Sequence, residues 1–304
     1  MECRDGKGGT KPTVSVGVCA YNEERNIRRS LESITSQALQ GFELAEVIVV
    51  SSGSTDGTDE AVRTFGANNR LVRLIPQPLR EGKNSAVNLF MSWARGDILV
   101  LVNADNVLVE GALQNLLVKF NDPQVGIAGG HPVPVNPKDT VTGFAVHMLW
   151  GMHHRVSLHY PKIGELIAFR NIHVQLPTDL QSDEDIIRME VEKRGYRSVY
   201  APEAIVRNKG PATVRDFIKQ RTRVNIGEGY MKRKFSYDIP TQDPRLLFSS
   251  FLDFIRDSRS SPFLMGAAML MEAYCRAYAR LYVALDKGDK MVWSPVDSTK
   301  NLST

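Results

Sequence analysis

Two short polar segments contain carboxylates that could bind a cation or accept a proton. The first is Asn103, Ala104 and Asp105, directly after the apolar run 98–102. A carboxylate there could hold a divalent cation that bridges a diphosphate. A polar turn that caps the next helix explains the same residues, so this cluster alone leaves both interpretations open.

The second cluster is Asp183, Glu184 and Asp185, at the start of a helical pattern over 183–194. Crowded acids raise the pKa of one another, which favours a general base. Three acids in a first helical turn also complement the helix dipole without any catalytic role.

Three further polar segments suit an anionic ligand. Small residues and free amides in 51–58 could cradle a ribose or a phosphate, and 81–84 is a turn with one cation, Lys83. Gln220, Arg221 and Arg223 lie in a basic helix whose guanidinium groups suit phosphate oxygens. An ordinary turn, or a solvated basic face, remains the alternative for each segment.

The elements that position these residues alternate over the first 130 residues. Strands are expected at 13–19, 46–50, 71–75 and 98–102. Asn22 and Thr58 are expected to cap the first two helices, and a third helix covers 84–93. This alternation predicts a parallel sheet, and ligands of such sheets bind at the carboxyl ends of the strands, where 51–58 and 103–106 fall.

The regular alternation of strands and helices ends after Gly130. We expect one helix within the irregular stretch 131–162, a strand at 164–170, extended chain at 196–200, a basic helix or helix pair at 213–232 and a linker at 240–244. The last helix, 263–285, has a polar stripe of Glu272, Arg276 and Arg280 with apolar residues elsewhere. Such a helix is either buried or lies in a membrane interface.

The composition is that of a globular protein. Among 304 residues, 42% are hydrophobic and 24% charged, which excludes disordered, collagenous and coiled-coil classes. A net charge of +4 is too small to indicate nucleic acid, which we do not expect as a partner. The three cysteines are far apart in the sequence, which indicates reduced thiols and a cytoplasmic location. No stretch reaches about 18 apolar residues, so no membrane-spanning helix is expected. Residues 1–12 are expected to be a flexible tail without a signal peptide.

Taken together, the order and spacing of the motifs resemble the family-2 inverting glycosyltransferases of the GT-A fold over roughly residues 12–235. The similar segments are Tyr21-Asn22-Glu23, the loop 51–58, the Gly-Lys segment 82–88, Asn103-Ala104-Asp105 in place of Asp-x-Asp, the strand 164–170, Asp183-Glu184 before Gly195-Tyr196, and Gln220-Arg221-Thr222-Arg223 with Val224 in place of Trp. Ser51-Ser52 and Asn103 depart from the acidic residues that the family often has there.

The resemblance implies an α/β, GT-A Rossmann-like nucleotide-binding sheet with a mixed acceptor half and C-terminal amphipathic helices. Its domains would be a catalytic domain at 13–235, divided into a nucleotide-sugar half (13–130) and an acceptor half (131–235), and a helical region at 236–304. The residues implied to bind the nucleotide sugar are Ala20, Tyr21, Asn22, Glu23, Ser52, Ser54, Asp56, Gly82, Lys83, Asn103, Ala104, Gln220, Arg221 and Arg223. Those on the acceptor side are Gly164, Glu165 and Arg170.

The implied reaction is a single displacement of a nucleotide-diphosphate sugar by an acceptor hydroxyl. A base from residues 183–185 would take the hydroxyl proton, and Mn²⁺ or Mg²⁺ at Asp105 would stabilise the leaving diphosphate. Counting back eleven residues from Gly195 favours Glu184, with Asp183 next, while Asp185 fits a literal Glu-Asp pair. Asn103 predicts weaker cation binding.

The C-terminal helix and the basic residues 232–234 favour peripheral binding to the inner face of a membrane and a lipid or lipid-linked acceptor. A helix packed on the catalytic domain, or a dimer interface, is the alternative, so homo-oligomerisation stays open. His147, His153, His154 and His159 suit packing or an acceptor pocket better than zinc, because no firm ligand pair is present.

Two rival functions remain for comparison. A nicotinamide-dependent oxidoreductase needs Gly-x-Gly-x-x-Gly after the first strand, which residues 18–22 lack. A non-catalytic, glycosyltransferase-like scaffold is consistent with Asn103 and Ser51-Ser52.

Overall fold

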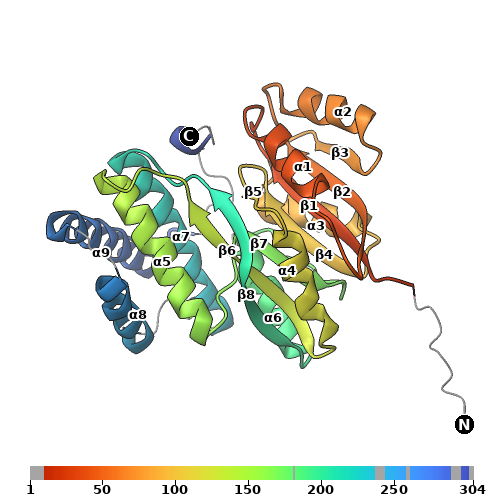
Figure 1. Cartoon of the computed structure of the whole chain (residues 1–304). Coiled ribbons are helices and arrows are strands. Elements are labelled where there is room, and N and C mark those ends of the chain that lie inside the picture. Colours follow the sequence, from red (N-terminus) through yellow and green to blue (C-terminus); the bar gives the residue numbers. More distant parts are fainter. Residues whose placement is uncertain (1–9, 181, 237–243, 258–260, 289–295, 301–304) are drawn as a thin grey trace, which may run out of the picture.

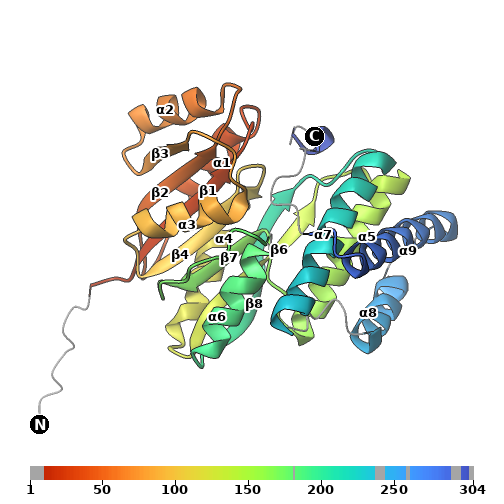
Figure 2. The same ribbon diagram turned by 180° about the vertical axis from the view of Figure 1, so that it is seen from behind.

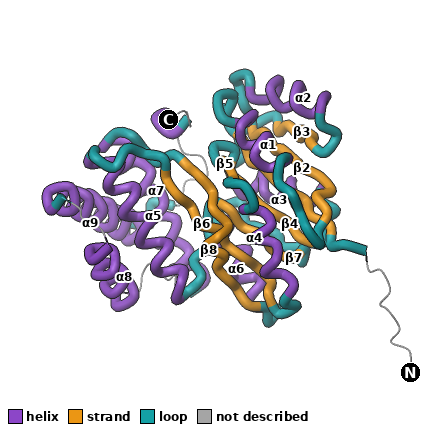
Figure 3. The backbone as a smooth tube through the Cα atoms, viewed as in Figure 1, coloured by secondary structure: helices purple, strands orange, loops and turns teal. Residues whose placement is uncertain are grey.

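A single mixed sheet organises the chain (Figure 1). The computed structural model describes residues 10–180, 182–236, 244–257, 261–288 and 296–300. Within these residues the sheet has eight strands in the order β3-β2-β1-β4-β7-β6-β8-β5. Helices cover both faces, and a group of helices stands beside the sheet (Figure 3).

The first half of the sheet is parallel, as its β-branched runs predict. It contains β1 (Thr13–Ala20), β2 (Glu43–Ser52), β3 (Val72–Gln77) and β4 (Ile98–Asn103). Val16 of β1 pairs with Val47 of β2 and with Val100 of β4. All three side chains are fully buried, so apolar burial on both faces holds these strands at the centre of the molecule.

Helices cover this half on both sides. α1 (Ile27–Thr35), α2 (Thr58–Asn68) and α4 (Ala112–Leu117) pack on one face, and α3 (Lys83–Trp93) packs on the other. Gly17 of β1 allows the close approach of α3, because a Cβ at this position would lie 2.6 Å from the ring of Phe90. α3 begins at Lys83, directly after Gly82.

The second half reverses direction. β7 (Leu166–Arg170) lies antiparallel between β4 and β6 (Val125–Pro134), and β8 (Arg197–Asn208) runs parallel to β6. The short β5 (Val107–Leu108) pairs with β8 at the edge of the sheet, and the single-turn η1 (Val118–Asn121) follows α4. α6 (Asp183–Lys193) packs on the same face as α3 (Figure 2). The predicted fold class is confirmed by this arrangement.

Four helices form the group beside the sheet. α5 (Val141–His159), α7 (Val214–Phe235), α8 (Pro244–Asp257) and α9 (Pro262–Ala284) pack together around a separate apolar cluster that includes Phe144, Phe217 and Phe254. The chain then returns toward the sheet, and its last described turn, η3 (Asp297–Thr299), lies between the helix group and the parallel half (Figure 1). In the described part of the chain, none of the helices combines the length and the apolarity that crossing a membrane requires.

Several local expectations are wrong. Asn22 does not cap α1: it has a left-handed φ of 53°, which Asn tolerates, and the helix starts four residues beyond Glu23 after Asn26. Thr58 is the first residue of α2, and Gly57 precedes it as the cap. β6 extends into the stretch expected to be irregular. α8 falls within the region 236–304 that is expected to be helical, although its bounds are not predicted. Most of the expected linker, 240–243, lies outside the described residues, and Pro244 already begins α8.

Candidate active site

A cavity of about 960 Å³ opens at the carboxyl ends of β1, β2 and β4 and extends toward α5, α7 and α9. It gathers most of the predicted site residues from both halves of the chain. Those that line it are Ala20, Tyr21, Glu23, Ser52, Gly82, Lys83, Asn103, Ala104, Asp105, Gly164, Glu165, Asp183, Glu184, Asp185, Gln220, Arg221 and Arg223. Asn22, Ser54, Asp56 and Arg170 are not among the lining residues.

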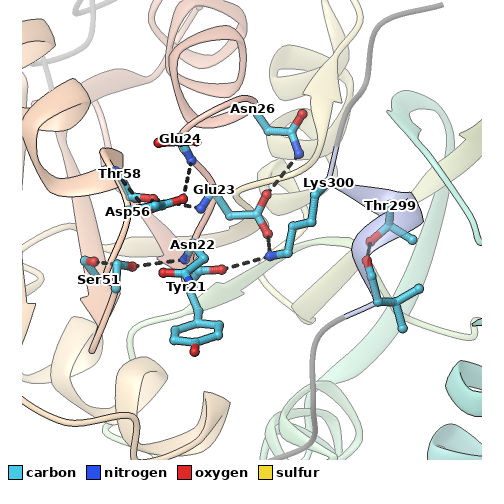
Figure 4. A network of polar contacts seen from close by, with 12 residues as sticks. Tyr21, Asn22, Glu23, Glu24, Asn26, Ser51, Asp56, Thr58, Thr299 and Lys300 are labelled. Carbon is cyan, nitrogen blue, oxygen red and sulfur yellow. Dashed lines mark hydrogen bonds and ion pairs between the residues drawn. The ribbon is translucent and has the colours of Figure 1, made fainter.

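Three of the four residues outside the lining connect the loops beside the cavity (Figure 4). Asn22 receives a hydrogen bond at Oδ1 from the Thr55 amide (2.8 Å), and its own amide donates to Ser54 Oγ (3.1 Å). Asp56 accepts hydrogen bonds from the amides of Thr58 (3.0 Å) and Glu24 (3.3 Å). These contacts hold the loops after β1 and β2 together, so the residues shape the rim of the cavity.

Arg170 lies at the end of β7 that is away from the cavity. Because β7 is antiparallel to β4, Arg170 pairs with Ile98, the first residue of β4. Its guanidinium donates to the carbonyl oxygens of Val125 (2.8 Å) and Phe120 (3.3 Å). The expectation of an acceptor-side role for Arg170 does not fit this position, since the direction of β7 carries it away from the cavity.

The cluster of acids is joined to the parallel half through Lys83. Gly82, at φ 94°, turns the chain into α3, and Lys83 Nζ lies 2.9 Å from Asp183 Oδ2 and 3.0 Å from Glu184 Oε1. The side chain of Asp183 is 2% exposed and that of Glu184 is 25% exposed. Glu184 is therefore the more accessible of the two carboxylates that share the Lys83 ammonium.

The environment separates these carboxylates electrostatically. Burial and the neighbouring Glu184 raise the pKa of Asp183 to about 7, although Lys83 opposes this rise. Burial also works against ionisation of Glu184, but Lys83 and Lys162 outweigh it and lower the pKa of Glu184 below its usual range. Burial raises the pKa of Asp185, against the field of Lys162. Glu184 is thus the one of these three acids whose pKa is lowered, and its side chain is open to the cavity.

Asn103 has a partner that explains its amide. Asn103 Nδ2 donates to Glu165 Oε2 at 2.8 Å, and Asn106 Nδ2 donates to the same oxygen at 3.0 Å. Glu165 has a left-handed φ of 61° at the entry to β7, which directs its side chain to β4. An aspartate at position 103 would place a second negative charge against Glu165, whereas an amide supplies a donor.

Asp105 carries the charge that a cation would need. Burial and the nearby Glu23 raise the pKa of Asp105 to about 6, so ionising it without a counter-charge is costly. Among the described residues, no group of three or more His, Cys, Asp and Glu side chains is placed to hold a metal ion by itself. The residues present fit a cation bound through Asp105 whose other ligands come from phosphate oxygens and water.

The two arginines of the basic helix differ in position. Arg221 makes a bidentate ion pair with Glu272 of α9, at 2.9 Å and 2.8 Å, and Arg276 donates to the same carboxylate at 2.7 Å. Arg223 lines the cavity within the electrostatic reach of Glu165 and Asp105, and burial lowers its pKa despite these acids. Arg223 therefore faces the Asp105 region, while Arg221 connects α7 to α9.

Arg80 and Lys300 are among the cavity residues that the sequence analysis did not identify. The Arg80 guanidinium lies 3.8 Å from the centre of the Tyr21 ring. Lys300 Nζ, from the far end of the chain, donates to the Tyr21 carbonyl oxygen at 2.8 Å and pairs with Glu23. An isolated Arg before a turn and a Lys near the terminus have no motif that would have marked them.

The predicted histidine cluster is dispersed by the fold. The rings of His131 and His154 stack at 4.1 Å, and His154 Nδ1 lies 2.8 Å from the Tyr200 hydroxyl. His147 Nε2 lies 2.8 Å from the Asn136 carbonyl oxygen. His153 is buried against the cavity, and burial lowers its pKa to about 3. These contacts agree with packing and pocket lining.

A Rossmann-like parallel half, a mixed second half and acids at the carboxyl edge define a GT-A glycosyltransferase. Residues 15–179 match glycosyl transferase family 2, and the chain belongs to this family. The family resemblance that the motifs predict is thereby confirmed.

A solved structure is similar over most of the chain. The mannosyltransferase PcManGT from Pyrobaculum calidifontis, determined with GDP-Man and Mn²⁺, superposes with a TM-score of 0.64. It is 25% identical, and the match covers 91% of this chain and 88% of that one.

Curated relatives match over shorter shares of their own length. The probable glycosyltransferase YdaM of Bacillus subtilis is 26% identical over 261 residues, which are 80% of this chain and 62% of YdaM. Poly-beta-1,6-N-acetyl-D-glucosamine synthase of Staphylococcus aureus is 26% identical over 219 residues, 68% of this chain and 52% of the synthase. An uncharacterized protein of Mycobacterium tuberculosis, MT1568, is 37% identical over 118 residues, 39% of this chain and 35% of that protein. The chain thus spans less than two thirds of each of these three relatives.

Proposed function

We propose that the protein transfers a sugar from a nucleotide-diphosphate sugar to an acceptor hydroxyl by a single, inverting displacement. The observation that carries this proposal is the placement of Glu184, held by Lys83, in the same cavity as Asp105 and Arg223. In these roles, Glu184 would be the proton acceptor, Asp105 the cation ligand and Arg223 the guanidinium that contacts the phosphate, which are the groups that displacement of a diphosphate requires. The solved mannosyltransferase with GDP-Man and Mn²⁺ supports the same donor class and a divalent cation.

Glu184 is the proposed base. Lys83 keeps its carboxylate ionised, and its side chain is accessible, so it can accept the proton of the attacking hydroxyl. The deeply buried Asp183 shares Lys83 and positions its ammonium. We assign Asp185, which faces Lys162, a supporting role in the electrostatics of the cavity.

The donor diphosphate would bind beside Asp105 and Arg223. Arg223 and the amides near Ala104 would contact its oxygens, and Tyr21 and Glu23 would lie near the nucleoside. A divalent cation bound at Asp105 supplies charge stabilisation for the departing diphosphate. Since no enzyme-bound sugar is needed, no side chain of the site has to act as a nucleophile.

The acceptor is proposed to carry an apolar chain. Beyond the carboxylates, the cavity is lined by apolar side chains of α5, α8 and α9: Leu149, Trp150, Met152, Phe248, Phe251 and Met269. A sugar or a soluble polar acceptor gains little from such a wall, whereas a lipid or lipid-linked acceptor buries its chain there.

The same helices support peripheral association with the inner face of a membrane. Large apolar residues are exposed along α8 and α9, namely Phe248, Leu252, Ile255, Phe263, Met269, Leu270, Tyr274, Tyr278, Leu281 and Leu285. Such a surface is costly in water and gains free energy at a lipid interface. We also retain 13–130 and 131–235 as the two parts of a catalytic domain, with the membrane-facing helices after residue 235.

The catalytic assignment is tested with Glu184→Gln. We expect this variant to lose sugar transfer and to bind the donor as wild type does. Donor binding is measured by the thermal shift that nucleotide sugars cause in the presence of Mn²⁺, Mg²⁺ or EDTA. Glu190→Gln is the matched control, because Glu190 lies on the same helix and pairs only with Lys193 on the surface among its described ion pairs. Inversion is read from the anomeric configuration of the product by NMR, and full activity in EDTA would contradict the cation assignment.

A further inference from the structure

Residues 296–300, here called the C-terminal strap, contribute Val296, Thr299 and Lys300 to the lining of the cavity. Its Ser298 hydroxyl donates to Asp216 Oδ2 (2.6 Å) and accepts from the Ala212 amide (3.2 Å), which anchors the strap to the start of α7. Val296 and Thr299 are buried in this position. The strap is therefore packed on the second half of the protein.

Lys300 extends from the strap to the first half. Its ammonium donates to the Tyr21 carbonyl oxygen at 2.8 Å and forms an ion pair with Glu23, whose carboxylate also accepts a hydrogen bond from Asn26 Nδ2 at 2.9 Å (Figure 4). The side chain of Glu23 is 8% exposed and that of Lys300 is 21% exposed. This is a sheltered ion pair, for which the loss of one partner matters more than it does at a surface.

The pair lies beside the cation ligand. Glu23 and Lys300 are the two charges that act most strongly on Asp105, and they act in opposite senses. Two other cations are nearby: Lys83 is already bound to Asp183 and Glu184, and Arg223 is within the electrostatic reach of Asp105. Among these cations, Lys300 is the one that pairs with Glu23 and acts most strongly on Asp105.

We infer that Lys300 is an intramolecular competitor of the divalent cation, and that it must leave Glu23 before a cation and a donor diphosphate can bind at Asp105. An ammonium and a divalent cation that neutralise the same acids repel each other, so the two cannot share this space at full strength. When no divalent cation is bound, the Lys300 ammonium thus offsets the negative charge of Glu23 and Asp105. This inference rests on the proposed cation role of Asp105.

The coupling is reciprocal by linkage. If release of Lys300 favours the cation, then the cation must favour release of the strap by the same factor. Removing the ammonium should tighten cation binding about fivefold or more, the lower end of typical coupling between sites.

The test is a titration of the full chain with Mn²⁺ alone, followed by electron paramagnetic resonance of the free ion. We expect tighter binding in Lys300→Met than in wild type, with Lys300→Arg close to wild type because it keeps the charge. Lys287→Met removes one positive charge from an exposed position at the end of α9 and controls for the change in net charge. Asp105→Asn, alone and with Lys300→Met, shows which binding belongs to this site.

Each outcome decides. Tighter, Asp105-dependent binding in Lys300→Met supports the inference, and unchanged or weaker binding overturns it. Absence of Asp105-dependent Mn²⁺ binding in Lys300→Met also overturns it, while the proposed transferase reaction is judged separately by the Glu184→Gln assay.

A second readout follows the strap itself. Hydrogen exchange of the amides in 296–300 should quicken when Mn²⁺ saturates the wild-type protein, because the strap loses its Lys300 contact. A strap with a purely structural role would exchange at the same rate with and without Mn²⁺. Slower exchange would mean that the cation holds the strap in place, which also contradicts the inference.

Discussion

Replacement of Lys83 by Met removes the only described ammonium within ion-pair distance of both Asp183 and Glu184. Met has a similar length and fills the same space at the start of α3, so the change is mainly one of charge. Two adjacent carboxylates, one of them almost fully buried, are then left without their counter-charge.

The expected cost lies between that of a buried and that of an exposed ion pair, because the Asp183 side chain is 2% exposed and that of Lys83 is 36% exposed. Breaking a fully buried pair costs about 3–5 kcal/mol, and solvent screening at Lys83 reduces this to about 1–3 kcal/mol. At roughly 2 °C per kcal/mol for a chain of this size, the melting temperature should fall by roughly 2–6 °C near pH 8.

The loss should depend on pH with a definite sign. Without Lys83, the pKa of Glu184 rises from its lowered value and that of Asp183 rises above about 7. An acid whose pKa is higher in the folded than in the unfolded state binds protons preferentially when folded, so stability falls as the pH rises. The gap between variant and wild type should therefore be small near pH 5 and grow toward pH 9.

The assay is thermal unfolding at several pH values, together with the pH profile of sugar transfer. Activity of Lys83→Met should need a higher pH than wild type, because the base is ionised later. Lys119→Met is the matched control, since Lys119 lies 3.9 Å from the exposed Glu203 and should cost less than about 1 kcal/mol at any pH. A gap between Lys83→Met and wild type that stays below 1 kcal/mol, or that does not change with pH, would refute this account of the acids.

Two further substitutions test other contacts of the site. Asn103→Asp should lower the melting temperature in the absence of metal, because it places a carboxylate next to Glu165 where the Asn103 amide donates at 2.8 Å. Mn²⁺ should restore the melting temperature, and equal melting temperatures of variant and wild type without metal would contradict this. Glu272→Gln should cost roughly 3 kcal/mol in urea unfolding because it leaves Arg221 and Arg276 without their shared carboxylate. In a double-mutant cycle with Arg221→Gln, the double variant Arg221→Gln/Glu272→Gln should recover the part of that loss that comes from Arg221, and strict additivity of the two single changes would show that the pair is not coupled.

The sequence was informative where local chemistry decides structure. The β-branched and apolar runs predicted β1 to β4 to within a few residues, because burial on both faces requires such runs. The polar segments that follow them were correctly expected at one edge of the sheet, and Lys83 and the acids 183–185 meet in one cavity. Their catalytic roles remain predictions.

Tertiary register decided what the sequence could not predict. The strand 164–170 was expected, but its antiparallel pairing was not, and this pairing brings Glu165 to Asn103 and sends Arg170 to the far edge. The sequence predicts Arg221 as a phosphate ligand because it shows only that Arg221 lies in a basic helix. Its partner Glu272 is 51 residues away, and Lys300 is 277 residues from Glu23, beyond any local pattern.

The antiparallel insertion of β7 has a consequence for any attempt to divide the chain. β7 covers the free edge of β4 through pairs from Ile98–Arg170 to Val102–Leu166, and it also pairs with β6. A fragment that stops at Gly130 keeps four parallel strands but exposes the backbone of β4, whose residues are apolar on both sides. Such an open, flat and apolar edge is a template for pairing with other chains. The two halves are therefore parts of one folding unit, and separate expression of the first should yield aggregates.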